Sequence, residues 1–440
     1  MKRYESYKDS GVQWIGEIPS HWGMVKLKYD FSIYAGATPK TEIADYWDGN
    51  IVWITPADYK SEDKFISQGQ RSISKKGYDS CNTQLVPKGS LVFSKRAPIG
   101  TVAISETELC TNQGCLSCVP KNVNTLFFYY LTSVFTEEFD LLGSGATFKE
   151  ISANDFSNVK LTLPPLEEQK AIAEWLDVKC EEIDRLIATQ QRRIELLQEL
   201  RQSIITRAVT RGINPDVPLR DSGIDWIGQI PSHWEISKMN YVCDVITDYV
   251  ASGSFADLKV NVTYLDEPDY AMLVRTADLS QKNKDVAKVY VSKQSYDFLS
   301  NSNLFGGEII LPNIGASIGD VYMVPIDLYD KMTLAPNSIM VKTKWCDLFY
   351  FYYFKSVCGR KSLELIGQAA AQGKFNKTEL RQLRLPLPPL SEQREIVAYI
   401  EKETTKVDHA LQQAERQIEL LQELRQSVIT EVVTGKRKVC

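Results

Sequence analysis

The stretches that decide the fold are LTLPPLEEQ at residues 161–169 and IELLQELRQSIIT at 194–206, because both occur a second time. They return as LPLPPLSEQ at 385–393 and IELLQELRQSVIT at 418–430. In each copy the proline pair ends one element and favours the start of the next, and the acidic residues after it suit the positive end of a helix. The sequence therefore contains the same helix-forming segment twice.

Each proline pair is followed by a stripe of mostly apolar positions at spacings of three, four and seven, the period of a helix with one apolar face. The stripe positions are Leu176, Ile183, Ile187, Gln190, Ile194, Leu197, Leu200 and Ile204 in the first copy and Ile400, Val407, Leu411, Ala414, Ile418, Leu421, Leu424 and Val428 in the second. The pattern stops near Thr210 and Thr434, where glycine follows.

A helix from Leu166 to Thr210 would be about 65 Å long and could not bury its stripe alone. Because the two stripes are nearly identical, we expect them to bury each other as an antiparallel coiled coil about a pseudo-two-fold axis, with one module at each end. The alternative is that each helix packs only on its own module.

A second repeated block precedes each module: DSGVQWIGEIPSHW at 9–22 and DSGIDWIGQIPSHW at 221–234. Only residues 211–220 separate the first helix from the second block, so that block should dock near the end of the first helix. Equivalence then places the N-terminal block near the end of the second helix and makes the two termini neighbours. The four tryptophans of the blocks are interpreted as packing anchors: Trp14, Trp22, Trp226 and Trp234.

The modules between the repeated segments are residues 23–160 and 235–384. They share only short similar segments at corresponding positions. WITPADY at 53–59 parallels LVRTADL at 273–279, SKRAPIGTVAI at 94–104 parallels NIGASIGDVYM at 313–323, and GSGATFKEI at 143–151 parallels GQAAAQGKF at 367–375. Short strands bounded by Gly and Pro alternate with aromatic segments that suit buried helices. We predict an α+β protein with two similar mixed α/β modules built on twisted sheets. The predicted domains are 1–160, 161–212 (first helix), 213–384 and 385–440 (second helix).

The bulk composition fits an ordinary globular protein of two or three domains: 440 residues with 43% hydrophobic and 10% aromatic content. No apolar run is long enough for a membrane span, and the first residues lack the apolar core of a signal peptide, so we expect a cytoplasmic location without membrane attachment. The cysteines should then be mostly reduced. Cys115 and Cys118 form a CxxC, but on a strand they would point to opposite faces, so we interpret them and Cys110 as buried small hydrophobes rather than zinc ligands.

Positive charge is concentrated inside the modules, although the chain carries a net charge of −5. Residues 71–100 contain six basic and one acidic residue, and residues 355–384 contain seven basic and two acidic, so each segment carries +5. Arginine and asparagine at turns can make the paired hydrogen bonds that distinguish guanine and adenine, and lysines can bind phosphates. The candidate DNA-binding residues are Lys88, Lys95, Arg96, Asn112, Gln113, Lys149, Asn313, Asn337, Lys374 and Lys377. The alternative is chance clustering on solvated surfaces.

Motifs for catalysis are not found in the sequence. There is no GxxxxGK[ST] phosphate loop, no GxGxxG turn after a strand and no Asn-Pro-Pro-aromatic stretch. His21 and His233 occupy matching places in the repeated blocks, which favours a structural role. We therefore expect no catalytic or metal-binding residues in this chain.

Taken together, these motifs resemble those of the specificity subunits of type I restriction–modification systems. The resemblance covers essentially the whole chain, through both WIG-x-IPSHW blocks, both LPPL-x-EQ helix starts, the IELLQELRQS helices and the GSGATFKEIS segment. The second module departs from the family pattern at 367–373, so a contact made by Ser144 or Thr147 cannot be transferred to it.

This resemblance implies two target-recognition domains, each reading one half of a split DNA sequence, and conserved helices that act as a ruler. It also implies double-stranded DNA, methyltransferase subunits and restriction (translocase) subunits as partners, with S-adenosylmethionine, ATP and Mg²⁺ bound by those partners and no cofactor in this chain. The alternatives are a self-contained nuclease or methyltransferase, a coiled-coil scaffold that binds only protein, and the specificity subunit of a modification-only complex.

Overall fold

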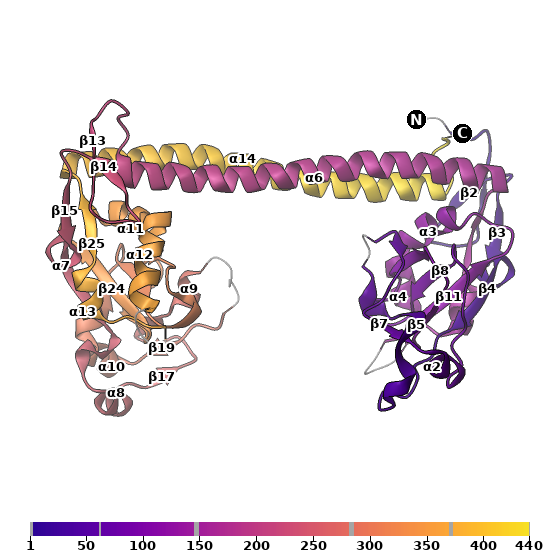
Figure 1. The fold of residues 1–440 in the computed structure, drawn as a ribbon, viewed down its shortest axis with the longest axis horizontal. Helices are drawn as coiled ribbons and strands as arrows, with labels where there is room; N and C mark the ends of the chain where they lie inside the picture. The colour runs from indigo at the N-terminus through magenta and orange to yellow at the C-terminus, as the bar shows by residue number, and fades with distance from the viewer. Residues whose placement is uncertain (1–2, 61–62, 145–148, 281–285, 369–372, 440) are drawn as a thin grey trace. The chain divides into compact units, whose positions relative to one another are not determined.

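A computed structural model describes residues 3–60, 63–144, 149–280, 286–368 and 373–439 (Figure 1). The chain divides into two compact units. Unit 1 comprises residues 1–191 and 415–440, and unit 2 comprises residues 192–414. Each unit contains one module and a portion of both long helices.

The two long helices predicted from the repeat are present as α6 (Leu166–Arg211) and α14 (Leu390–Val433). The first ends one residue beyond the predicted Thr210. Gly212 and Gly435 follow the two helices with positive φ angles of 70° and 74°. Glycine adopts this left-handed backbone without the penalty that a Cβ would bring, which is why the helices stop there.

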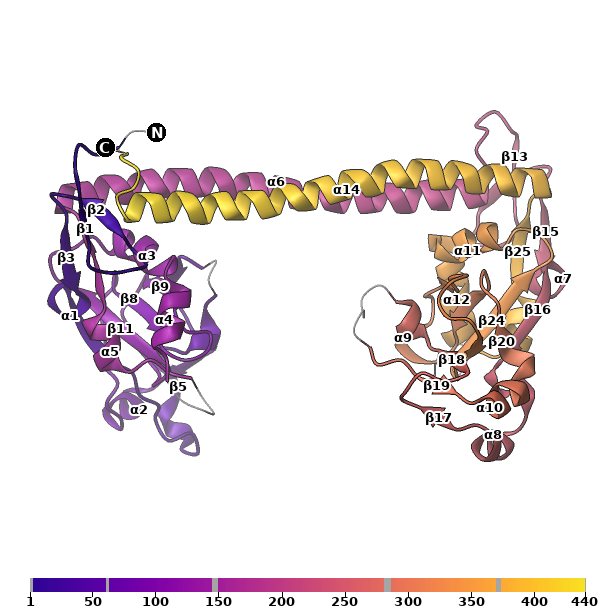
Figure 2. The same cartoon turned by 180° about the vertical axis from the view of Figure 1, so that it is seen from behind.

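Within each unit the two helices pack side by side and run antiparallel, as predicted (Figures 1 and 2). In unit 1, Thr162, just before α6, donates a hydrogen bond to the Val433 carbonyl, and Asp184 pairs with Arg425 at 3.0 Å. Residue numbers that rise along α6 therefore lie beside residue numbers that fall along α14. In unit 2 the same order holds, because Arg201 pairs with Asp408 at 2.8 Å, and Gly212 lies beside the Glu392 side chain.

The predicted stripe is wrong at Leu200 and Leu424, which are 49% and 48% exposed. Beyond them, burial is complete at Ile205 and Ile429, each 1% exposed. A straight helix has 3.6 residues per turn, so a stripe spaced by sevens drifts around it, and the buried face passes to the next residue.

The first module contains two sheets whose central strand order recurs in the second module. The larger sheet of the first module has the strand order β4-β11-β8-β9-β6, and its second sheet has the order β10-β5-β7 with β10 parallel to β5. Their bounds are β4 (Phe31–Ala35), β11 (Cys115–Pro120), β8 (Leu91–Ser94), β9 (Val102–Ser105), β6 (Phe65–Ile66), β10 (Leu109–Thr111), β5 (Trp47–Ile54) and β7 (Arg71–Ile73).

In the second module the order β16-β24-β21-β22 matches β4-β11-β8-β9, and the parallel pair β18–β23 matches β5–β10. The bounds are β16 (Cys243–Asp248), β24 (Ser338–Thr343), β21 (Ile309–Pro312), β22 (Tyr322–Met323), β17 (Tyr264–Leu265), β19 (Tyr290–Val291), β18 (Ala271–Val274), β23 (Met332–Leu334) and β20 (Asn303–Leu304). The prediction that both modules share one α+β fold is confirmed.

The aromatic segments form helices, and most of their aromatic side chains are buried in the module cores, as predicted. In the first module Phe127, Phe128 and Leu131 are fully buried, and in the second Phe349, Tyr350 and Tyr353 are. These helices are α3 (Thr125–Ser133), α4 (Thr136–Leu142), α11 (Asp347–Lys355) and α12 (Val357–Gln368). The shorter helices are α1 (Leu27–Asp30), α2 (Lys75–Asp79), α5 (Ala153–Asn158), α7 (Met239–Val242), α8 (Phe255–Asn261), α9 (Thr276–Leu279), α10 (Lys293–Phe298) and α13 (Lys377–Gln382).

Short two-stranded sheets join each module to its long helix. The strand that leads into α6 pairs antiparallel with the strand after the first repeated block, and the second copy repeats this arrangement before α14. Each repeated block forms a hairpin of its own. The strands are β3 (Gly23–Lys26) with β12 (Lys160–Leu163), β15 (Glu235–Lys238) with β25 (Arg384–Leu387), β1 (Tyr7–Asp9) with β2 (Glu17–Pro19), and β13 (Leu219–Asp221) with β14 (Gln229–Pro231).

The repeated blocks hold the first turn of each long helix. Trp22 is fully buried and donates its indole N–H to the Glu168 carboxylate at 3.1 Å. His21 contacts the same carboxylate at 2.9 Å, and His233 contacts Glu392 at 2.8 Å. The two histidines thus occupy equivalent structural positions at the helix starts.

The other block tryptophans differ in how deeply they are packed. Trp234 is 1% exposed, like Trp22, whereas Trp14 and Trp226 are only half-buried. Trp14 stacks on Phe135 with ring centroids 6.2 Å apart. Its partners are therefore packing contacts in the module core.

The two ends of the chain lie together in unit 1, as predicted (Figure 1). Tyr7 donates its hydroxyl to the Gly435 carbonyl at 3.2 Å, and Lys438 lies over the Tyr4 ring at 5.6 Å. Gly435 also sits against Pro19, so that a Cβ at this position would meet the proline ring at 2.2 Å. The C-terminal segment thus packs on the N-terminal block.

The CxxC cysteines lie on β11 and face two different cores. Cys115 belongs to the cluster around Ile54 and Val92, and Cys118 belongs to the cluster around Phe31. Burial raises the pKa of the Cys115 thiol to about 12, so it stays a neutral thiol at physiological pH. The strand prediction for this motif is confirmed, and the two sulfurs cannot bind one ion.

Candidate nucleic-acid interface

Four of the predicted site residues of the first module gather where β8 ends and β11 begins. Lys95 and Arg96 follow β8, and Asn112 and Gln113 precede β11. The Lys95 N–H donates to the Gly114 carbonyl at 2.9 Å, which joins the two segments. We call this region, together with residues 149–150, the β8 corner.

The cations of the β8 corner are held by carboxylates. Glu150 binds Lys95 Nζ through Oε1 at 2.6 Å and Arg96 Nε through Oε2 at 2.7 Å. Burial raises the pKa of the Glu150 carboxyl, but the hydrogen bonds and charges of Lys95 and Arg96 outweigh burial and hold that pKa below its usual value. Lys149 pairs with Asp140.

The polar amides of this corner are also engaged. Asn112 accepts a hydrogen bond from the Gly114 N–H at 2.9 Å, which shapes the turn. Gln113 is exposed, and its side chain bonds to the Thr38 hydroxyl. Gln113 is therefore better placed than Asn112 to meet a ligand.

The structure separates Lys88 from the other predicted residues. It lies in the turn before β8, whereas Lys95 and Arg96 lie after the same strand. The neighbouring Gly89 carbonyl accepts a hydrogen bond from Thr125 at the start of α3. Lys88 is exposed at the opposite end of the strand from the β8 corner.

The predicted residues of the second module gather at the equivalent corner, where β21 ends and β24 begins. The Asn313 N–H donates to the Asn337 carbonyl at 3.2 Å, and Ile314 forms an isolated antiparallel bridge with Lys374. We call residues 313–314, 337 and 373–375 the β21 corner. Asn337 is exposed and has a positive φ of 67°, a conformation that asparagine tolerates better than most residues.

The side chains at and beside the β21 corner differ in how they are engaged. Asn313 donates its amide to the Phe375 carbonyl at 2.9 Å, so this side chain holds the loop. Lys377 pairs with Asp248 at 2.8 Å and is largely covered. Lys374 is exposed and forms no ion pair with any described residue.

Backbone hydrogen bonds show which residues of the two corners correspond. Ile151 N–H donates to the Lys95 carbonyl, and Phe375 N–H donates to the Asn313 carbonyl. Asn313 is therefore the counterpart of Lys95, one residue out of step with the parallel between 94–104 and 313–323. It follows that Arg96 corresponds to Ile314, and Glu150 to Lys374, because each pair forms the same isolated bridge.

Sequence reasoning missed Glu150 and Thr38 as members of the site. Glu150 lies inside the quoted GSGATFKEIS segment, but only the fold brings it against a turn 54 residues earlier. Thr147 of the same segment lies outside the described residues. The available signal for Glu150 was that two adjacent cations, Lys95 and Arg96, favour an acidic partner.

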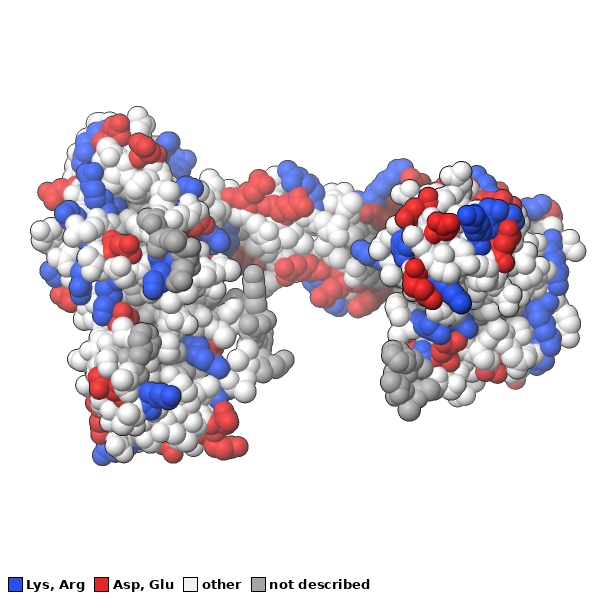
Figure 3. Space-filling view, turned by 60° about the horizontal axis from the view of Figure 1, so that its bottom comes forward, with Lys and Arg blue, Asp and Glu red and all other residues white. Residues whose placement is uncertain are grey.

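Surface charge is mixed on the face seen in Figure 3, where basic and acidic side chains are interspersed. Such a surface supplies few uncompensated charges for binding phosphates without regard to sequence. Discrimination between nucleic-acid sequences would therefore depend on a small number of positioned side chains at the two corners.

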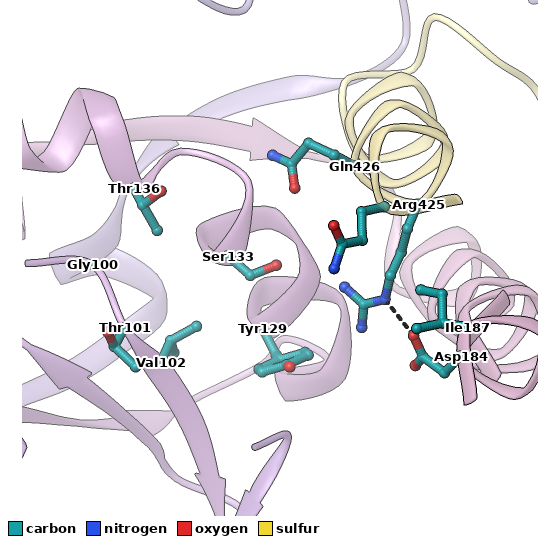
Figure 4. A pocket seen from close by; sticks show the side chains of 11 residues that line it. Gly100, Thr101, Val102, Tyr129, Ser133, Thr136, Asp184, Ile187, Arg425 and Gln426 are labelled. Carbon is teal, nitrogen blue, oxygen red and sulfur yellow. Dashed lines mark hydrogen bonds and ion pairs between the residues drawn. The ribbon is translucent and has the colours of Figure 1, made fainter. Parts of the chain in front are cut away.

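A cavity of about 500 Å³ lies where the first module meets the long helices of unit 1 (Figure 4). Tyr129 and Ser133 line it from α3, Asp184 from α6 and Arg425 from α14. The Ser133 hydroxyl donates to the Tyr130 carbonyl of its own helix, so it is not activated by a base. The cavity has no pairing of nucleophile and base among its described residues.

In both units a glutamine on a long helix donates a hydrogen bond to the module packed against it. Gln426 donates to the Val134 carbonyl in unit 1, and Gln202 donates to the Lys355 carbonyl in unit 2. These glutamines follow the two interhelical arginines in the repeated LRQS segment. The repeat therefore encodes how each module is attached to the helices.

Two properties of the described residues bear on metal ions and membranes. No cluster of three or more His, Cys, Asp or Glu side chains suited to a metal ion occurs among them. None of their helices is both long and apolar enough to cross a bilayer.

Comparison with known proteins gives matches along most of the chain. The family model described as the type I restriction modification DNA specificity domain matches residues 19–198 and again residues 231–420. The putative type I restriction enzyme MjaX specificity subunit of Methanocaldococcus jannaschii is 25% identical over 97% of this chain and 96% of its own length. The MjaIX specificity subunit of the same organism is 37% identical, over 42% of this chain and 43% of its own length.

Solved structures show the same fold. The HsdS subunit from Thermoanaerobacter tengcongensis superposes with a TM-score of 0.55 at 16% identity, covering 96% of this chain and 98% of that one. A chain from a study of complex assembly and conformational transition of the type I R-M system gives a TM-score of 0.69 at 17% identity, covering 94% and 98%. With two matches to one family model that together span most of its length, this chain belongs to the type I restriction–modification DNA specificity family.

Proposed function

We propose that this chain is the DNA-recognition subunit of a type I restriction–modification complex, and that each module reads one half of an asymmetric bipartite target in double-stranded DNA. One observation carries the proposal. The two corners have the same backbone bridges but different side chains, Arg96 and Glu150 in one and Ile314 and Lys374 in the other. Two modules with one scaffold and unlike reading residues suit a target whose halves differ.

Recognition at each corner would divide between phosphates and bases. The exposed Lys88 and Lys374 suit phosphate contacts, which supply affinity without regard to sequence. Arg96 and Asn337 suit base edges in the major groove, because arginine pairs with guanine and asparagine with adenine. Lys95, Asn112, Asn313 and Lys377, which are tied into the fold, would support the readers.

The paired helices α6 and α14 would set the distance between the two half-sites. A helix of 46 residues is about 70 Å long, and paired helices resist bending more than a single one. Half-sites read from one face of B-DNA are centred about one turn, roughly 34 Å, or a multiple of that distance apart. The length of the helices would thus fix the length of the unread gap.

Partner subunits would carry the chemistry. The repeated IELLQELRQS segments leave leucines exposed on both helices, Leu196 and Leu200 in unit 2 and Leu420 and Leu424 in unit 1, each between 42% and 49% exposed. Leucines four residues apart on one helix face suit docking of protein helices. We propose that methyltransferase subunits and restriction subunits bind this chain in the cytoplasm and hold S-adenosylmethionine, ATP and Mg²⁺, and that the chain itself catalyses nothing.

The decisive experiment replaces residues 235–384 with the second module of another family member and maps methylated adenines in a host that supplies the partner subunits. We expect one half-site to change while the other half-site and the gap stay as in the parent. Loss or change of both half-sites would contradict modular reading. No sequence-dependent methylation with intact complexes would favour the protein-only scaffold, and modification or cleavage by the purified chain alone would favour a self-contained enzyme. Methylation without cleavage by the complete complex would assign a modification-only system.

A further inference from the structure

The two adjacent cations of the β8 corner are not equivalent. The Lys95 side chain is 12% exposed and the Arg96 side chain is 44% exposed, although both bind Glu150. Lys95 is therefore a largely buried counter-ion. Arg96 is the cation of this pair that can reach a ligand.

The backbone fixes the carboxylate that holds Arg96. Glu150 and Ser144 exchange two backbone hydrogen bonds of 3.0 Å, and the next residue, Ile151, is fully buried and donates to the Lys95 carbonyl. Glu150 therefore cannot move away without breaking the bridge to Arg96. Its Oε1 is taken by the largely buried Lys95, which leaves Oε2 for the Arg96 guanidinium.

Glu150 occupies only one edge of the guanidinium. It binds Nε, and in the described part of the chain the two Nη groups have no hydrogen-bond partner. Two parallel N–H donors are what a guanine edge requires for a bidentate contact with O6 and N7. A planar group held on one side loses less conformational freedom when it binds on the other.

The second module shows that the fold does not need this ion pair. It forms the same bridge with Ile314 and Lys374, a combination that contains no carboxylate and no guanidinium. A purely structural role would call for the pair, or an equivalent, in both modules. The pair instead varies where the two modules are expected to read different bases.

We propose that Arg96 reads a guanine in the half-site of the first module and that Glu150 is the positioning residue that orients its guanidinium. This inference rests on the function proposed above. The carboxylate also compensates the charge of the corner, so Arg96 would contribute more to discrimination between bases than to general attraction for phosphates. If a pyrimidine or adenine replaced the guanine, the two Nη donors of Arg96 would lack a matching pair of acceptors.

The test maps methylation in a host that supplies the partner subunits, with the full chain carrying Arg96→Lys or Glu150→Gln. Arg96→Lys keeps the charge but removes the planar fork, so we expect discrimination at one G·C pair of the first half-site to fall by roughly tenfold to a hundredfold. Glu150→Gln should relax the same position by a smaller factor, because a neutral amide holds the guanidinium more weakly. The second half-site is the internal control and should not change.

A third variant guards against misfolding. The triple change Lys95→Asn, Arg96→Ile and Glu150→Lys copies the three residues that the second module has at the same bridge, and it does not leave the buried Lys95 without its carboxylate. This variant should have the same melting temperature as the parent and should lose the preference for guanine.

Three results would overturn the inference: a parent half-site without any G·C pair, unchanged preference in Arg96→Lys, or equal relaxation of both half-sites. If the parent complex methylates no bipartite site, the proposed function itself fails. If the parent does so and the variants match it, only the role of Arg96 and Glu150 is wrong.

Discussion

Single residues at the helix starts show how much one carboxylate can do. Glu168, whose side chain is 13% exposed, accepts hydrogen bonds from Tyr4 and Trp22 and contacts His21. Its counterpart Glu392 contacts His233, but the Trp234 indole N–H has no partner among the described residues. The two repeats are therefore similar in sequence but differ in their hydrogen bonds.

Glu168→Ala should lower the free energy of unfolding by about 1–3 kcal/mol, because it leaves the buried Trp22 indole N–H without an acceptor. Glu392→Ala should cost less, since Trp234 makes no such bond in the parent. Urea unfolding of each variant, followed by tryptophan fluorescence, measures both changes in the free energy of unfolding.

The matched control is Glu167→Ala, which removes an 84% exposed carboxylate of the same turn. Such surface pairs contribute about 0–1 kcal/mol, so this variant should behave like the parent. Equal losses for the Glu168 and Glu392 variants would contradict the role given to the Trp22 bond.

At the scale of elements, two glycines are needed for different reasons, one in the first repeated block and one after α14. Gly16 and Gly435 both have positive φ angles, 70° and 74°. A Cβ on Gly16 would meet nothing within 4 Å, whereas a Cβ on Gly435 would collide with Pro19. The pair separates backbone strain from crowding.

Gly16→Ala should cost only the left-handed backbone penalty of about 1–2 kcal/mol. Gly435→Ala adds overpacking against the Pro19 ring, so its total cost should be about 2–5 kcal/mol. Thermal unfolding of both variants gives the comparison. Similar melting temperatures for the two would show that the C-terminal segment does not pack on the N-terminal block in solution.

Elements also show where periodicity stops being informative. The repeat predicted both long helices to within a residue at their ends, since prolines and glycines mark them. It assigned Leu200 and Leu424 to the buried stripe, yet the structure leaves them exposed and buries Ile205 and Ile429 instead. The direction of a drifting stripe depends on what covers each part of the helix.

At the scale of the whole molecule, the proposed ruler makes a prediction about length. Seven residues inserted after Gln191 and again after Ala414 add two full turns to each helix and keep the stripes in phase. The helices would lengthen by about 10 Å, and the unread gap should grow by roughly three base pairs while both half-sites stay the same. Methylation mapping reads both quantities.

Insertion into α6 alone is the control, because it puts one stripe out of step with its partner over half the length and should lower stability. A gap of unchanged length in the double insertion, with intact half-sites, would refute the ruler. The predicted domain boundaries remain predictions, to be tested by the module exchange.

By itself, the sequence determined everything that follows from repetition and local chemistry: two long helices, two modules of one fold, buried cysteines on a strand and neighbouring termini. These features depend on residues close together in the chain or on copies of one segment. Only the tertiary structure decided which cations are available. Lys95 and Arg96 are adjacent and chemically alike in the sequence, but Glu150, brought in from a distant loop, buries one and leaves the other exposed. Contacts between distant residues depend on how the sheets pack, and no local pattern encodes them.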